Sequence, residues 1–170
     1  MKTSYMLDKV RYTRGGMPLF QKFYRKYNDS SNGMVKLYYK ILFTLMKKIN
    51  HIEISLNTKI GSGLYIGHPY CITINPEVVM GANINIHKGV TIGKENRGAR
   101  KGAPILGDEV WIGVNSTIVG NITIGNDVLI APNTFVNCDV PSHSIVFGNP
   151  CIIKHVEFAT ENYINNRLEK

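Results

Sequence analysis

The sequence is short of the features that mark membrane-spanning and secreted proteins. None of its apolar runs approaches the ~18 residues needed to span a bilayer. Residues 1–14 carry charges throughout and contain no apolar segment, so no secretory signal is predicted there. The three cysteines, Cys71, Cys138 and Cys151, are too scattered for a disulfide framework. We therefore expect a protein of the reducing cytoplasm.

Acidic residues are scarce in the first part of the chain. Residues 1–50 hold eleven Lys and Arg against two Asp and no Glu, a net charge of +9, whereas residues 51–170 hold nine against ten, a net charge of −1. A nearly neutral second part argues against nucleic-acid binding there. The basic first part suits an anionic partner, such as a membrane surface or a phosphate-bearing substrate, or is simply a solvated face.

What the sequence does contain is a large aliphatic residue at every sixth position. One frame covers Ile54, Ile60 and Ile66; after a slip of two residues at 72–73 the next covers Ile74, Met80, Ile86 and Ile92; the last covers Leu106, Ile112, Ile118, Ile124, Ile130 and Val136. A period of six fits neither an α-helix nor an alternating strand. Hexapeptide repeats are typical of a parallel β-helix, in which stacked coils bury one continuous core. A β-sandwich would instead show a period of two.

Helices are predicted on both sides of the repeats. Pro18 suits the first turn of a helix that carries Phe20 and Tyr24 on one side. Residues 34–49 carry a helical apolar stripe and predict a second helix. We expect this helix to cap the β-helix; alternatively, residues 34–50 lie on a membrane surface. Residues 1–16 read as a loose lead-in, and 157–170 as a small polar C-terminal helix. The predicted organisation is an N-terminal helical segment (1–50), a β-helix domain (51–154) and a tail (155–170).

The repeat is interrupted once by a long polar insertion. Residues 94–104 (KENRGARKGAP) contain four basic residues and two glycines. Insertions between the coils of a solenoid often form its binding face. We therefore expect this loop to take part in binding.

Three stretches of the sequence resemble the hexapeptide-repeat acyltransferases, and within them the serine acetyltransferase-like branch. They are residues 52–74, residues 110–136, and residues 139–154, where Val-Pro is followed by Gly-Asn-Pro and a lysine. The resemblance implies a left-handed β-helix, an exception to the usual right-handed crossover. It also implies a homotrimer, with acetyl-CoA as co-substrate in the groove between neighbouring subunits and no metal ion.

The same resemblance implies a catalytic base. His68 matches the histidine that acts as general base in serine acetyltransferases, and Glu53, fifteen residues earlier, stands where that family carries an aspartate. A base is needed because an alcohol is too weak an acid to attack a thioester unaided. A carboxylate on the other ring nitrogen would hold the tautomer. We expect direct transfer without an acyl-enzyme, since no cysteine accompanies the base as a nucleophile.

Contacts to the donor carry over more loosely. The resemblance places the backbone of four residues beside the pantetheine arm: Gly113, Asn115, Ala131 and Asn133. Lys154 follows the Gly-Asn-Pro-Cys segment, where it would approach the phosphates of CoA. Arg97, Arg100 and Lys101 of the inserted loop are further candidates, although single basic residues of this kind are often only solvated.

The departures from the family pattern concern the acceptor. Where the family carries Arg-His-Pro the sequence has Gly102-Ala103-Pro104, and Gly67 replaces the acidic residue before the catalytic histidine. Both changes remove groups that would hold an amino acid. We therefore expect a hydroxyl of a sugar or glycan intermediate in surface-polysaccharide biosynthesis as acceptor, with serine O-acetylation in cysteine biosynthesis as the alternative.

Other interpretations remain open at this point. His87 also follows a repeat isoleucine and is a possible secondary base, or else a packed histidine. Zinc carbonic anhydrases share the left-handed β-helix, but His51, His68 and His87 lack the close paired spacing of zinc ligands. A non-catalytic trimeric scaffold is the alternative of another class, and it would require His68 to be dispensable.

Overall fold

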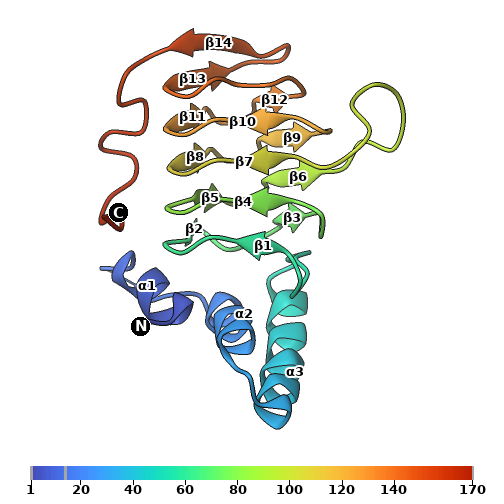
Figure 1. Cartoon of the computed structure of the whole chain (residues 1–170), viewed down its shortest axis with the longest axis vertical. Coiled ribbons are helices and arrows are strands. Elements are labelled where there is room, and N and C mark those ends of the chain that lie inside the picture. Colours follow the sequence, from blue (N-terminus) through green and yellow to red (C-terminus); the bar gives the residue numbers. More distant parts are fainter. Residues whose placement is uncertain (1, 14, 170) are drawn as a thin grey trace.

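The computed structural model describes residues 2–13 and 15–169, and it consists of a three-sided stack of coils with helices at one end (Figure 1). Short parallel strands form three sheets, each named here by its first strand. The β1 sheet contains β1 (Lys59–Ile60), β4 (Val79–Met80), β7 (Ile105–Leu106) and β10 (Thr123–Ile124). The β3 sheet contains β3 (Thr73–Ile74), β6 (Thr91–Gly93), β9 (Thr117–Val119) and β12 (Phe135–Val136).

The β2 sheet is the longest and runs the full height of the stack. It contains β2 (Tyr65–Gly67), β5 (Asn85–His87), β8 (Val110–Ile112), β11 (Val128–Ile130), β13 (Ser144–Phe147) and β14 (Ile152–His155). All its pairings are parallel except that of β13 with β14, which is antiparallel. This closing hairpin ends the series of coils.

The six-residue repeat is the core of the stack, as predicted. Ile66 pairs with Ile86, Ile86 with Ile112, and Ile112 with Ile130, so one aliphatic column runs up the inside of the β2 sheet. The last predicted frame, from Leu106 to Val136, is at most 2% exposed at every position. The predicted parallel β-helix is therefore confirmed, because each coil buries its aliphatic residues only against its neighbours.

The two-residue slip in the repeat lies at a corner of the stack. Ile72 and Ile74 are both buried, so the extra residues do not expose an aliphatic side chain. They lengthen the connection between β2 and β3, where His68 and Cys71 both have positive φ values of 56° and 53°. Two left-handed residues in one connection turn the chain sharply while leaving the His68 side chain exposed.

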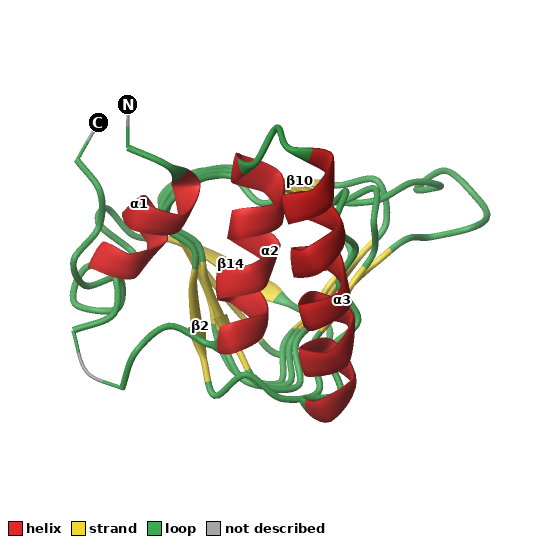
Figure 2. Ribbon diagram, turned by 90° about the horizontal axis from the view of Figure 1, so that it is seen from below, coloured by secondary structure: helices red, strands yellow, loops and turns green. Residues whose placement is uncertain are grey.

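Three helices cover the lower end of the stack (Figure 2): α1 (Ser4–Val10), α2 (Leu19–Asp29) and α3 (Gly33–Ile49). The helix predicted after Pro18 is α2, and its residues Phe20 and Tyr24 join the core. The prediction of a loose lead-in over residues 1–16 is wrong. Residues 4–10 form α1 because the short helix is anchored by one buried polar side chain, Asp8.

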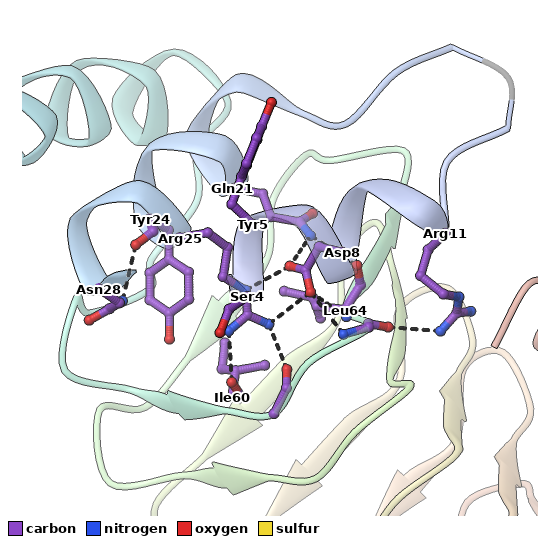
Figure 3. A network of polar contacts seen from close by, with 12 residues as sticks. Ser4, Tyr5, Asp8, Arg11, Gln21, Tyr24, Arg25, Asn28, Ile60 and Leu64 are labelled. Atoms are coloured by element: carbon purple, nitrogen blue, oxygen red, sulfur yellow. Dashed lines mark hydrogen bonds and ion pairs between the residues drawn. The ribbon is translucent and has the colours of Figure 1, made fainter. Parts of the chain in front are cut away.

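Asp8 is fully buried and collects five hydrogen bonds (Figure 3). Arg25 of α2 donates two of them, at 2.6 and 3.2 Å, and Gln21 donates one at 2.8 Å. The backbone amides of Gly63 and Leu64 in the first coil donate the others at 2.9 and 3.0 Å. Arg25 also donates to the carbonyl of Ile60. One carboxylate thus joins α1 and α2 to the β-helix.

The helix α3 does not cap the coils in the way that its apolar stripe predicts. Its outer face exposes Met34, Leu37, Tyr38, Ile41, Leu45 and Ile49, and its one fully buried residue is Phe43, on the opposite side, beside Tyr24 of α2. The reason is that α2 already covers the end of the core with Phe20 and Tyr24. Within the described residues, no helix has the length and apolarity to span a bilayer.

The predicted C-terminal helix is also wrong. Residues 156–169, called here the C-terminal strap, run back down the outside of the stack as a series of turns (Figure 1). Phe158, Asn162 and Asn166 have positive φ values, which a right-handed helix does not allow. The backbone amides of Ala159 and Thr160 donate to the carboxylate of Asp127 instead of to carbonyls of a helix.

Candidate active site

The candidate base, His68, lies at the corner that follows β2, and its side chain is exposed. Outward-facing residues of the β2 sheet continue up the stack beside this corner. Gly67 pairs with His87, and Gly113 and Ala131 each stand one residue beyond the pair that Ile112 forms with Ile130. Residues with small or no side chains therefore flank His87 in this column, and Gly67, Gly113 and Ala131 are called here the strip of small residues.

His87 is the large side chain between these residues, and its environment defines its protonation. Its Nδ1 lies 3.0 Å from the carbonyl oxygen of Ile112. Since a carbonyl oxygen only accepts, Nδ1 carries the proton and Nε2 has the free lone pair. Burial lowers the pKa of His87, the bond to Ile112 acts in the opposite direction, and the neighbouring His68 lowers it further. His87 is therefore a neutral hydrogen-bond acceptor at neutral pH.

The glycine before His68 has a structural explanation that the sequence does not reveal. A Cβ atom on Gly67 would lie 3.0 Å from Cδ2 and 3.1 Å from Nε2 of His87. The imidazole ring of His87 therefore fills the space above Gly67, which is the residue that precedes His68. A larger side chain at position 67 requires His87 to move.

The structure does not join Glu53 to His68. Glu53 is exposed, forms a parallel bridge with Thr73, and lines a recess of about 840 Å³ between α3 and the β3 sheet. Among the described residues no hydrogen bond or ion pair links its carboxylate to His68. His68 instead acts electrostatically on His87, whose pKa it lowers.

The predicted donor residues fall into one group and two outliers. Gly113, Asn115, Ala131 and Asn133 occupy corresponding positions in two successive coils, where Asn115 and Asn133 turn the chain with φ values of 58° and 59°. Lys154 lies on β14 at the top of the stack, exposed and paired with Ile145. Arg97 is at the exposed end of the inserted loop (94–104), which projects from the stack between β6 and β7 (Figure 1).

Sequence reasoning missed a polar pocket beside His87. It has a volume of about 350 Å³ and lies between the β2 sheet, the residues after α1 and the C-terminal strap. Its walls include Arg11, Asn85, His87, Trp111 and Tyr163. Arg11 is 3% exposed, although nothing in the local sequence distinguishes it from the other basic residues of the first segment. Its role depends on contacts with residues more than fifty positions away.

Clusters suited to a metal ion are not part of this site. Nowhere in the described parts of the chain do three or more His, Cys, Asp or Glu side chains gather closely enough to hold one. Cys71 is exposed on the corner that carries His68. The other two thiols, of Cys138 and Cys151, are 3.7 Å apart near the top of the stack.

Comparison with known proteins identifies this architecture. Residues 103–138 match the family described as bacterial transferase hexapeptide (six repeats). The chain is 36% identical over 111 residues to a serine acetyltransferase of Staphylococcus epidermidis, covering 65% of this chain and 52% of the relative. It is 34% identical over 110 residues to the serine acetyltransferase of Helicobacter pylori, covering 65% and 64%. The chain therefore spans about half to two thirds of the length of these relatives.

Solved structures agree with the sequence relatives. Neisseria gonorrhoeae serine acetyltransferase superposes with a TM-score of 0.64 at 29% identity, covering 82% of this chain and 54% of that one. A Brucella abortus serine acetyltransferase in complex with coenzyme A gives a TM-score of 0.66 at 25% identity, covering 82% and 54%. The protein is a left-handed β-helix like these structures, and residues 103–138 carry the hexapeptide repeats of the bacterial transferases. In sequence and in fold, the chain resembles the serine acetyltransferase-like branch.

Proposed function

We propose that the protein is an acetyl-CoA-dependent O-acetyltransferase in which His68 is the general base. The proposal is carried by one combination: the chain is similar to serine acetyltransferases, and it has an exposed histidine, His68, at a sharp corner beside the strip of small residues. In the reaction, His68 takes the proton of the acceptor hydroxyl as its oxygen bonds to the thioester carbon. The carbon–sulfur bond then breaks, and the proton passes to the departing thiolate of CoA.

The strip above His87 supports the placement of acetyl-CoA. We propose that the pantetheine arm lies along the coil at Ala131 and Gly113, with Asn115 and Asn133 at the adjoining turns. Lys154 and Arg97 are proposed partners of the phosphates. Glu53 is proposed to orient His68, which requires movement of both exposed side chains when substrates bind.

Serine is the first candidate acceptor. The relatives that the chain matches are serine acetyltransferases, including structures solved with serine and with cysteine. No relative among them supports a polysaccharide pathway. The missing acidic residue at position 67 is also a weaker argument against serine than the sequence alone indicates, because the His87 ring fills that space.

A hydroxyl of a sugar or glycan intermediate stays the second candidate. The observation that favours it is that no acidic side chain lines the pocket beside His87, so an ammonium group has no carboxylate partner there. Gly102 and Ala103 likewise offer no charged group. A surface-polysaccharide acceptor therefore belongs in the same assay as serine.

The test is release of the CoA thiol from acetyl-CoA with serine and with a panel of sugars. His68→Ala is expected to lower the rate by at least 10²-fold, since it removes a general base. His87→Ala separates a secondary base from a binding role. Cys71→Ser should leave turnover intact if transfer is direct. Undiminished turnover by His68→Ala would remove this histidine from the mechanism, and a lack of turnover with every acceptor favours a non-catalytic scaffold.

Two proposals concern assembly and location. We propose a homotrimer, in which the strip beside His68 faces a neighbouring subunit, and light scattering in solution tests this. We further propose that the protein works in the cytoplasm, with the exposed apolar face of α3 and its lysines at the inner face of the membrane. Flotation with anionic vesicles, compared with an Ile41→Glu, Leu45→Glu variant, tests this location; equal behaviour would exclude it.

A further inference from the structure

The top of the stack brings together two thiols that are thirteen residues apart in the sequence. The Sγ atom of Cys138 lies 3.7 Å from that of Cys151. Cys138 follows β12 in the last coil, and Cys151 lies in the turn that joins β13 to β14 (Figure 1). Both side chains are half-buried. The spacing of the cysteines does not reveal this contact, because it depends on the return of the chain through β13.

The segment that carries Cys138 is fixed to the coil below it. The amide of Thr123 donates to the carboxylate of Asp139 at 2.7 Å, and the amide of Val140 donates to the carbonyl of Thr123 at 2.9 Å. Val140 is buried in the core. These contacts of the two following residues hold Cys138 beside the turn of the hairpin.

The hairpin that carries Cys151 is held less firmly. The amide of Phe135 donates to the carbonyl of Gly148 at 3.2 Å, and Cys151 packs against the edge of the core. All four residues of β14 are exposed, and within the described sheet β14 pairs with β13 on one side only. A strand with few buried contacts opens locally more often than the rest of a fold. A covalent bond at Cys151 would therefore change the mobility of this hairpin.

The contact between the two sulfur atoms suits disulfide formation. The atoms need to approach only from 3.7 Å to the roughly 2.05 Å of a disulfide bond. Burial raises the pKa of the Cys138 thiol, and Cys151 and Asp139 act in the same direction, while Arg100 of the inserted loop opposes them. Because the attacking species is the thiolate, the pair persists as a dithiol at neutral pH until it meets an oxidant.

We propose that Cys138 and Cys151 form a reversible disulfide, with glutathione disulfide as oxidant, and that this bond fastens the closing hairpin to the last coil. One thiolate attacks a sulfur of glutathione disulfide and releases one glutathione. The second thiolate then attacks the protein sulfur of the mixed disulfide and releases the other. Two protein thiols are oxidised, one glutathione disulfide is reduced to two glutathione thiols, and the two protons pass to these thiols.

Such a bond acts as a switch rather than as a permanent cross-link. In a reducing compartment, disulfides are transient and are typical of redox sensing. Since β14 also carries Lys154, the oxidation state of the pair sets how firmly the strand with this lysine is held. The inference goes beyond the proposed function and does not require it.

Two variants with two thiols each test the pairing. Cys71→Ser keeps the proposed pair, and Cys138→Ser is its matched control, with Cys71 and Cys151 left. Each full-length variant is equilibrated in mixtures of reduced and oxidised glutathione, its free thiols are blocked, and its mass is measured. We expect Cys71→Ser to lose two hydrogen atoms per chain without a glutathione adduct, and to regain them with dithiothreitol. Cys138→Ser should instead form glutathione adducts or cross-linked chains.

Hydrogen exchange in Cys71→Ser measures the fastening of the hairpin. A cross-link that closes a loop of about 15 residues disfavours the open chain by a factor of roughly 10². Opening of the hairpin frees only part of this loop, so we expect the amides of β14 to exchange at least tenfold more slowly in the oxidised form than in the reduced form. The amides of β2, at the other end of the stack, should exchange equally in both forms.

The outcomes are distinct from those of the transferase assay, because neither measurement uses acetyl-CoA. Thiols of Cys71→Ser that stay reduced in oxidised glutathione, or that form only adducts and cross-linked chains as in Cys138→Ser, would overturn the disulfide. Equal exchange of the β14 amides in the oxidised and reduced forms would overturn the fastening of the hairpin.

Discussion

The buried carboxylate of Asp8 makes a quantitative prediction about how the helices are held on the β-helix. Asp8→Ala removes the acceptor of five hydrogen bonds and leaves Arg25, 3% exposed, without its ion-pair partner. Truncating one partner of a buried ion pair typically costs about 3–5 kcal/mol. Because domains are stable by only about 5–15 kcal/mol in total, the change should be easily measured.

The assay combines urea unfolding with hydrogen exchange. We expect the free energy of unfolding to fall by about 3–5 kcal/mol. If the helices detach without global unfolding, the amides of Gly63 and Leu64 should exchange roughly 10²- to 10³-fold faster, at about 1.4 kcal/mol per factor of ten. Local exchange therefore detects the effect even when the β-helix stays folded.

An exposed aspartate provides the matched control. Asp29 accepts hydrogen bonds from the amides of Ser4 and Tyr5 at 3.2 and 2.9 Å, on the solvent side of the same helices. Asp29→Ala should cost about 0.5–1 kcal/mol, as for the loss of a helix cap. A loss below 1 kcal/mol for Asp8→Ala, with unchanged exchange at Gly63 and Leu64, would refute the reasoning that this carboxylate docks the helices.

Three further predictions follow from single contacts. Burial acts to raise the pKa of Asp127, but hydrogen bonds from Thr160, His143 and Ala159 outweigh it and lower the pKa. Docking of the strap should therefore be complete above the ordinary carboxyl pKa and be lost as the pH falls through the lowered pKa of Asp127. In Asp127→Ala, the amide of Thr160 should exchange roughly tenfold to 10²-fold faster. Gly67→Asp should raise the pKa of His87 above its wild-type value by about 1–3 units in an NMR titration, whereas Gly67→Asn should not; no difference between the two would mean that the ring does not face this position. Ile118→Ala should lower the free energy of unfolding by about 2–5 kcal/mol in urea, and a cost equal to that of half-exposed Val119→Ala would contradict its place in the core.

The fold was predictable because its signal is local and repeated. Leu106, Ile112 and Ile118 are each the buried aliphatic residue of their strand. Because many positions give the same indication, one misleading position does not change the prediction. The helix α2 was predictable for a similar reason, since Pro18 and the spacing of its aromatic residues agree.

The helices α1 and α3 show where periodicity stops being sufficient. The apolar stripe of α3 identifies a helix correctly, but it does not say which surface the stripe packs against. In the structure α2 covers the end of the core, and the stripe of α3 is exposed. α1 has seven residues, and the only one that is buried is the charged Asp8. It is held by Asp8, whose partners Arg25 and Leu64 are far along the chain.

The candidate site divides in the same way. His68 could be selected from its motif and from the irregularity of the repeat around it. Its relation to Glu53 could not be, because spacing in the sequence does not state which side chains meet across a corner. The contact between Gly67 and His87 depends on the register of two strands twenty residues apart. The sequence therefore indicates a missing acidic residue at position 67, where the structure has the imidazole ring of His87.

The sequence by itself determined the β-helix, its interruption at residues 94–104 and the candidate base, because each depends on patterns within a few residues. Only the tertiary structure decided which histidine lies beside the base, where the C-terminal strap runs, and that Arg11 is buried without a charged partner. These features arise from contacts between segments twenty or more residues apart, such as His87 with Gly67 and Arg11 with Gly63 and Asn165. Local periodicity carries no record of such contacts, since the energy that selects them is released only when the coils, the helices and the strap pack together.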